Sequence, residues 1–382
     1  MDEQIKVGGS KKVWLIVGVI IVIVLIIIGF SAVQKPTETG PIKIGWVGPL
    51  TGDVSNIGRN EKSATELAVD EVNKAGGING RPIQVIYEDG KCVNTNANAA
   101  ANKLINIDKV SVILGGLCSG ETMAFTDMAE KSKTVVLSPC SSNPAITNAG
   151  DYIFRNYPSD NYQGSFDADY LYKTLGKKKV AVLYVQTDYA TGIRAVFVEA
   201  FKKLGGTIVA DESAVQSSTD FRSQLTKIKS ANPEAIYFIS MTGEAITGIK
   251  QARQLGINVP FFGADSWGDE KIWSTLGKDG EGSMYSHVFT PLTEAFKTAM
   301  KNKIGTDTLT ICSPQAYDGL KLLAQAMSKV GTNPEAIKNE LYKTVYTGGV
   351  SASKIQFDSN GDMVGADYSI EIVRNGKTET LK

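Results

Sequence analysis

Two short apolar stretches of this chain each end in a loop that is rich in hydroxyl groups. The stretch at 110–114 leads into a loop containing Ser119, and the stretch at 134–137 leads into a loop containing Ser142. In an open α/β sheet, ligands bind outside the carboxyl ends of the strands, where helices that begin there add free N–H groups. Two such loops side by side could hold a small carboxylate. No nucleophile with an adjacent base accompanies them, so we predict a binding site and no enzymatic activity.

Alternating strands and helices must position these loops. The first series has strands at 42–47, 83–88, 110–114 and 134–137 and helices at 60–74, 95–106 and 121–131. The pattern restarts with helices at 162–175, 191–204, 221–230 and 242–255 and strands at 179–184, 207–211, 235–240 and 261–263. Such βαβ repetition implies a mostly parallel sheet with helices on both faces. We therefore predict an α/β protein with two doubly wound parallel-sheet lobes joined by a hinge, which traps a ligand between them.

The C-terminal part of the chain has too few strands for a third lobe. We expect it to complete the first two, so that the chain crosses between the lobes more than once. The predicted first lobe comprises residues 42–159 and 288–365, and the second comprises residues 160–287 and 366–382.

The N-terminus carries an apolar run, Val13–Phe30, of 18 residues without a charge. This length suits a membrane-spanning helix, and the three lysines before it favour a cytoplasmic N-terminus. We predict a cytoplasmic segment at 1–12, a transmembrane anchor at 13–30 and a tether at 31–41. The localisation would be single-pass in the cell membrane, with the binding domain extracellular or periplasmic. A cleaved signal peptide, whose apolar part is usually about 7–15 residues long, and a soluble core helix are the alternatives.

The overall charge excludes one class of partner. The chain has 40 acidic and 40 basic residues, and its formal net charge is zero. Because nucleic-acid binding needs a basic face, we expect no nucleic-acid partner. The single histidine, His287, weakens any site built on a histidine base or histidine metal ligands. We expect no metal and no cofactor.

The chain has four cysteines, whose spacing fits no zinc signature. Outside the cytoplasm, disulfides are permitted. Cys92 and Cys118 each follow a predicted strand, and if those strands are neighbours the two residues are close enough to bridge. We predict the disulfide Cys92–Cys118. The sequence leaves open whether Cys140 and Cys312 are free or paired.

Several motifs resemble those of type I periplasmic binding proteins, and most closely the leucine/isoleucine/valine-binding proteins of branched-chain amino acid ABC transporters. The resemblance covers about residues 42–375. The motifs are IGWVGPLTG at 44–52, ELAVDEVN at 66–73, AGGINGR at 75–81, YEDGKC at 87–92, DYATG at 188–192, ARQLG at 252–256 and FGAD at 262–265. The resemblance also implies the disulfide Cys92–Cys118.

The resemblance implies how an α-amino acid would be held. Ser119 and Ser142 would receive the α-carboxylate, and the backbone carbonyl of Cys140 would accept from the ammonium group. Asp160 and Asp265 would pair with the ammonium group. Both charges of a buried zwitterion need such partners, because an unpaired buried charge is costly.

Two further positions complete the predicted ligand contacts. Tyr189 resembles an aromatic wall of the site. Met241 stands where branched-chain binders tend to have tyrosine, and Asp265 is shorter than the glutamate common there. Because methionine is adaptable, the pocket could differ in width from those relatives.

These observations predict an extracytoplasmic substrate-binding component of an ABC transporter, with permease subunits as partners. The ligand would be an amino acid, with a branched-chain amino acid favoured. The alternative is a membrane-tethered sensory ectodomain for a small amide or another small solute. The segment before the apolar run is too short for a signalling domain, which favours transport.

Overall fold

The computed structural model describes residues 40–306, 309–365 and 367–381. Within these ranges, the residues from Pro41 onward form one compact unit. The predicted anchor at 13–30 and the segment before it lie outside the described residues, so both stay predictions. No helix in the described part of the chain has the length and apolar character needed to cross a bilayer.

The first sheet has five parallel strands in the order β2-β1-β3-β4-β5. Their bounds are β1 Ile42–Gly48, β2 Ile83–Asp89, β3 Val112–Gly115, β4 Val135–Ser138 and β5 Ile153–Arg155. Gly115 has a φ of 138°, and a Cβ atom there would lie 2.2 Å from the carbonyl oxygen of Val47. Only glycine allows β3 to end this close to β1. We call this sheet and the helices packed on it the first lobe.

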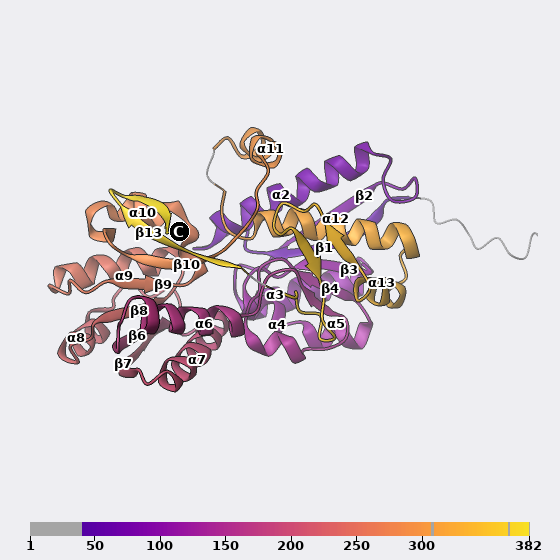
Figure 1. Ribbon diagram of the computed structural model, residues 1–382. Coiled ribbons are helices and arrows are strands. Elements are labelled where there is room, and N and C mark those ends of the chain that lie inside the picture. Colours follow the sequence, from indigo (N-terminus) through magenta and orange to yellow (C-terminus); the bar gives the residue numbers. More distant parts are fainter. Residues whose placement is uncertain (1–39, 307–308, 366, 382) are drawn as a thin grey trace, which may run out of the picture. The chain divides into compact units, whose positions relative to one another are not determined.

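Helices from both ends of the chain cover the first sheet. They are α2 Ser55–Lys74, α3 Asn94–Asn102, α4 Ser119–Met123, α5 Thr126–Ser132, α11 Glu294–Ile304, α12 Ser313–Val330 and α13 Pro334–Leu341. Figure 1 shows α12, from the C-terminal third of the chain, lying beside α2. Part of the C-terminal third of the chain therefore packs in the first lobe.

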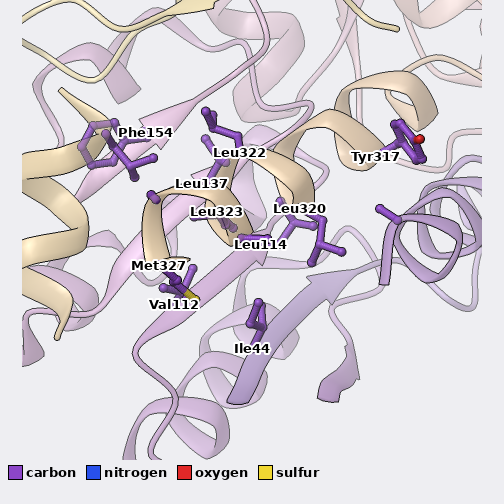
Figure 2. Close-up of a cluster of buried hydrophobic side chains, with 14 of the residues drawn as sticks. Ile44, Val112, Leu114, Leu137, Phe154, Tyr317, Leu320, Leu322, Leu323 and Met327 are labelled. Atoms are coloured by element: carbon purple, nitrogen blue, oxygen red, sulfur yellow. The ribbon is translucent and has the colours of Figure 1, made fainter. Parts of the chain in front are cut away.

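The core of the first lobe is built between α12 and the sheet (Figure 2). Leu320 and Leu323 of α12 share this buried cluster with Ile44, Leu114 and Leu137 of three strands. All five side chains are fully buried. Burying a leucine or isoleucine side chain contributes about 1.5–3 kcal/mol, so α12 anchors the strand ends from which the candidate site loops leave.

The second sheet has seven strands in the order β14-β13-β10-β9-β8-β6-β7. Their bounds are β6 Lys179–Val185, β7 Thr207–Ala214, β8 Ala235–Ile239, β9 Phe261–Gly263, β10 Met284–Val288, β13 Tyr368–Arg374 and β14 Lys377–Leu381. The helices packed on it are α6 Asp160–Asp169, α7 Asp188–Lys203, α8 Arg222–Ser230, α9 Thr242–Gln254 and α10 Glu270–Leu276. We call this sheet and its helices the second lobe (Figure 1).

The second sheet is not wholly parallel, which corrects the prediction of two parallel sheets. Strand β13 pairs antiparallel with β10 on one side and with β14 on the other. The turn between them is Asn375-Gly376, and both residues have positive φ, at 54° and 72°. An Asn-Gly pair is the preferred two-residue turn of a β-hairpin, because its twist matches that of the strands.

Several element boundaries differ from the predictions. The helix predicted at 121–131 is divided into α4 and α5. The helices predicted to start at 60, 162 and 191 begin earlier, at Ser55, Asp160 and Asp188. Strands β5, β10, β14 and β11 Val345–Thr347 were not predicted; β11 pairs antiparallel with β12 Lys354–Gln356 in a small ribbon. The strands that were not predicted are short and include polar residues, so they lack the apolar run that marks β3 and β4.

All four cysteines are in disulfides. The predicted Cys92–Cys118 bond is present, with the two Cα atoms 5.5 Å apart. However, β1 lies between the strands that precede these cysteines, so the assumption that those strands are neighbours was wrong. Cys140 and Cys312, left open by the sequence, are also bonded to each other, with Cα atoms 5.2 Å apart.

Candidate functional site

The loops after β3 and β4 meet loops of the second lobe around a small cavity of about 30 Å³, which we call the site cavity. The two strands are neighbours, so their loops lie side by side as predicted. Six of the seven predicted contact residues line the cavity, namely Ser119, Cys140, Ser142, Tyr189, Met241 and Asp265. The seventh, Asp160, lies behind Ser142 and is fully buried.

The two serine hydroxyls make different hydrogen bonds. Ser119 Oγ accepts from the backbone N–H groups of Ser142, at 3.3 Å, and Asn143, at 3.1 Å. Its own proton is therefore available to donate to a carboxylate. Ser142 Oγ instead donates to Asp160 Oδ2 at 3.0 Å. In this orientation Ser142 can only accept from a ligand, which suits an ammonium group better than the carboxylate that the resemblance implied.

The backbone amides around Ser119 are already used within the protein. The N–H groups of Leu117 and Cys118 donate to Glu121 Oε2, at 3.1 and 3.0 Å. The N–H group of Cys92 donates to Glu121 Oε1 at 2.9 Å. Burial raises the pKa of the Glu121 carboxyl to about 7, although these three donors favour its charged form. Glu121 thus fixes the loop that presents Ser119.

We expect Glu121→Ala to destabilise the protein by about 3 kcal/mol, because three buried N–H groups lose their acceptor at about 1 kcal/mol each. Urea unfolding followed by circular dichroism would measure the change. Glu121→Gln is the matched control, because it keeps one acceptor oxygen and should lose clearly less. Equal stability of Glu121→Ala and the wild type would mean that these three bonds contribute nothing.

The acidic groups of the site outnumber nearby positive charges. Asp265 accepts from the hydroxyls of Tyr157, at 2.5 Å, and Tyr189, at 2.8 Å. Asp160 Oδ1 has no hydrogen-bond partner among the described residues. Burial raises the pKa of Asp160 well above its usual range, and the nearby Asp265 raises it further, while Ser142 and Arg155 oppose the shift. The site is therefore electronegative and suits a positively charged group.

Apolar side chains form the rest of the site cavity. Ile57, Leu117 and Ile311 line it with Met241, and Ser266 adds a hydroxyl next to Asp265. The sequence analysis did not identify Ile57, Leu117, Ile311 or Ser266. Leu117 and Ser266 are sequence neighbours of predicted contacts, so adjacency could have found them. Ile311 comes from a distant segment without a periodic pattern, and only the fold places it here.

No group of histidine, cysteine, aspartate and glutamate side chains in the described part of the chain could hold a metal ion. What the site offers instead is a hydroxyl donor from the first lobe and a carboxylate from the second. The apolar wall lies beside them. This arrangement can bind a small molecule that has an anionic end, a cationic end and an apolar part.

The sequence matches the periplasmic binding protein family over residues 41–377. The chain belongs to this family. It is 28% identical over 354 residues to a leucine-, isoleucine-, valine-, threonine- and alanine-binding protein of Pseudomonas aeruginosa, an alignment that covers 90% of this chain and 92% of the relative. The predicted resemblance to type I periplasmic binding proteins of the leucine/isoleucine/valine-binding group is confirmed.

Solved structures of this family have the same fold. A leucine-binding protein, LivK, from Thermotoga maritima superposes with a TM-score of 0.82 at 28% identity, covering 89% of this chain and 98% of that one. The branched-chain amino acid transporter substrate-binding protein LivJ from Streptococcus pneumoniae, in complex with isoleucine, gives 0.81 at 31% identity, covering 89% and 99%. These homologues are solute-binding proteins and not enzymes, in agreement with the sequence analysis.

Proposed function

We propose that this periplasmic binding protein is the substrate-binding component of an ABC transporter and binds an aliphatic α-amino acid, with branched-chain amino acids favoured. The observation that carries the proposal is the site cavity itself, which Ser119 and Asp265 line together with the apolar side chains of Leu117 and Met241. The names of the relatives, which range from alanine to leucine binding, support the same ligand class. The partners would be ABC permease subunits.

In this proposal the ligand-contacting residues are those predicted from the sequence, with two changes of role. Ser142 accepts from the ammonium group in place of donating to the carboxylate, and Asp160 acts without direct contact. Ser119 donates to the α-carboxylate. Asp265 accepts from the ammonium group directly, and Asp160 adds its negative charge from behind Ser142. Tyr189 holds Asp265 by its hydroxyl while its ring forms a wall of the site. The Cys140 carbonyl is a further acceptor for the ammonium group.

The binding mechanism we propose is a ligand-driven shift from an open to a closed arrangement of the lobes. Hydrogen bonds already cross between the lobes, from Asn94 Nδ2 to Asp188 Oδ2 at 3.1 Å and from Ser217 Oγ to Asp53 Oδ2 at 2.8 Å. The site cavity has room for about two water molecules, so the lobes must separate to admit a ligand. We propose that the hinge consists of the segments where the chain passes from one predicted lobe to the other. We also propose that the apolar run at 13–30 anchors the protein in the membrane.

A thermal-shift screen of the purified protein against the common amino acids tests this function. Simple amides and small organic acids serve as controls. A ligand at about 100 times its dissociation constant should stabilise the protein by about 2.7 kcal/mol, which raises Tm by a few degrees. Stabilisation by amides alone would favour the alternative, a membrane-tethered sensory domain. If no amino acid raises Tm, the amino-acid proposal is wrong.

The affinity for an amino acid should fall as the pH is lowered, beginning at a higher pH than the value near 4 at which ordinary aspartates titrate. Burial and the charge of Asp265 raise the pKa of Asp160. Protonation of Asp160 at low pH removes a negative charge that would attract the ammonium group, so binding is coupled to proton release in the pH range where Asp160 titrates. Asp167, also buried with a raised pKa, and Arg155 are the other charged groups that act on Asp160.

Isothermal titration calorimetry between pH 8 and pH 5, in buffers of different ionisation enthalpy, would measure both the affinity and the protons released. Asp160→Asn is the control, because its affinity should depend less on pH than that of the wild type. An affinity that is constant over this range in the wild type would contradict the role of Asp160.

A further inference from the structure

A second and larger cavity lies next to the site cavity. Its volume is about 200 Å³, against about 30 Å³ for the site cavity. Both lobes contribute to its lining, with His287 of β10 on one side and Gln315 of α12 on the other. Ile311 lines both cavities. We call it the rear cavity.

The two cavities are separated by very few groups. Cys140 lines the site cavity and Cys312 lines the rear cavity, so the disulfide between them runs from one to the other. Tyr157 lines the rear cavity, and its hydroxyl donates to Asp265, which lines the site cavity. We call the disulfide, the Ile311 side chain and this hydrogen-bonded pair, which connect the linings of the two cavities, the partition.

The disulfide makes this partition rigid. Cys312 directly precedes α12, which is packed into the core of the first lobe. Cys140 lies in the loop after β4, where the Ser138 hydroxyl accepts from the backbone N–H of Ser141 at 2.9 Å. Cys140 and Cys312 are 9% and 1% exposed, so both sulfur atoms lie in packed surroundings. A covalent bond between two packed elements cannot move aside for a longer ligand.

Two residues that line the rear cavity, His287 and Gln315, have buried polar atoms that the protein does not use. His287 Nδ1 and Gln315 Oε1 are buried and have no hydrogen-bond partner among the described residues. Buried polar atoms normally have partners, so a rotation of these two side chains toward the rear cavity would present them to a bound polar group. Gln315 Oε1 can only accept, and a neutral imidazole can accept through one nitrogen. A ligand group with N–H donors, such as a side-chain amide or ammonium, fits these atoms.

We infer that the Cys140–Cys312 disulfide, together with Ile311, is a specificity determinant that keeps the ligand side chain out of the rear cavity. This inference rests on the proposed amino-acid binding function. With the partition intact, the site accepts short aliphatic side chains. Without it, the rear cavity becomes an extension of the site that takes longer side chains with terminal N–H donors, as in glutamine or lysine.

The test compares affinities for valine and glutamine in the full chain and in Cys140→Ala/Cys312→Ala. Isothermal titration calorimetry would measure both ligands. We expect the glutamine-to-valine affinity ratio to rise by about tenfold or more in the variant, because filling added pocket volume is worth about that much discrimination. Cys140→Ser/Cys312→Ser is the matched control, since it breaks the covalent bond but keeps most of the side-chain volume, and its ratio should rise less.

The result that would overturn the inference is an unchanged ratio in a variant that folds as the wild type does by circular dichroism. If the double variant does not fold, Ile311→Ala, which thins the partition with the disulfide intact, should raise the same ratio, and an unchanged ratio there would overturn the inference equally. If the wild type binds no amino acid, the proposed function fails. A crystal structure of the double-alanine variant would then test separately whether the disulfide keeps the two cavities apart. Joined cavities in this variant would support the role of the disulfide as a barrier, and separate cavities would refute that role.

Discussion

Asp265→Asn is expected to weaken binding of an α-amino acid by at least about 30-fold. Asp265 is the carboxylate from the second lobe that lines the site cavity, and it is 3% exposed. Removing one partner of a buried, hydrogen-bonded charge pair costs about 2–5 kcal/mol, and about 1.4 kcal/mol corresponds to a factor of ten. Asparagine has nearly the same shape and still accepts from Tyr157 or Tyr189, so the loss would reflect the charge.

Isothermal titration calorimetry with the ligand identified by the thermal-shift screen would measure this loss. Asp160→Asn is the comparison, because that carboxylate lies behind Ser142 and acts on the ligand over a longer distance. We expect its loss to be about tenfold, smaller than that of Asp265→Asn. An affinity of Asp265→Asn within threefold of the wild type would show that no ammonium group is bound there. The two variants together identify which acid contacts the ligand.

Arg155→Met is expected to lower the free energy of unfolding by about 3–5 kcal/mol, the usual cost of breaking a buried ion pair from one side. The Arg155 side chain is fully buried and donates to both oxygens of Asp362, from Nε at 2.6 Å and from Nη2 at 2.8 Å. It also donates to the carbonyl oxygen of Asn143 at 2.8 Å. The variant leaves the Asp362 carboxylate without its cation.

Urea unfolding of three proteins would test this ion pair. Arg155→Met should show the full loss, and Arg155→Met/Asp362→Leu should recover much of it, because no unpaired charge remains. Lys203→Met, which removes an exposed partner of Glu199, should leave stability unchanged. Equal stability of Arg155→Met and Lys203→Met would contradict the prediction. Because Asn143 follows Ser142, the same variant also tests whether this ion pair supports the candidate site.

Much of the fold could be predicted from the sequence because long helices and most buried strands carry periodic signals. Helix α2 shows apolar residues at helical spacing, and β1 is a short apolar run bounded by turn residues. The antiparallel pairing of β13 and β14 also has a local signal in the sequence, the Asn375-Gly376 turn. Strands β5 and β10 had none, because they are short and their apolar residues are accompanied by polar ones such as Arg155 and His287.

The sequence by itself determined that the two serine hydroxyls of the first lobe meet at the candidate site. Ser119 and Ser142 follow β3 and β4, and parallel strands that are neighbours bring their carboxyl ends to the same edge. The contacts expected from the second lobe, such as Tyr189 and Asp265, came from motifs and not from spacing. They also line the site cavity.

Only the tertiary structure decided how those groups are used. The direction of the Ser142 hydroxyl depends on Asp160, which is 18 residues away and buried behind it. The bond between Cys140 and Cys312 joins positions 172 residues apart, and it exists because α12 packs against the sheet of the first lobe. Local patterns report periodicity and turns, whereas such pairings depend on which faces pack together. Which faces pack together is decided by the summed burial of many side chains and by no single motif.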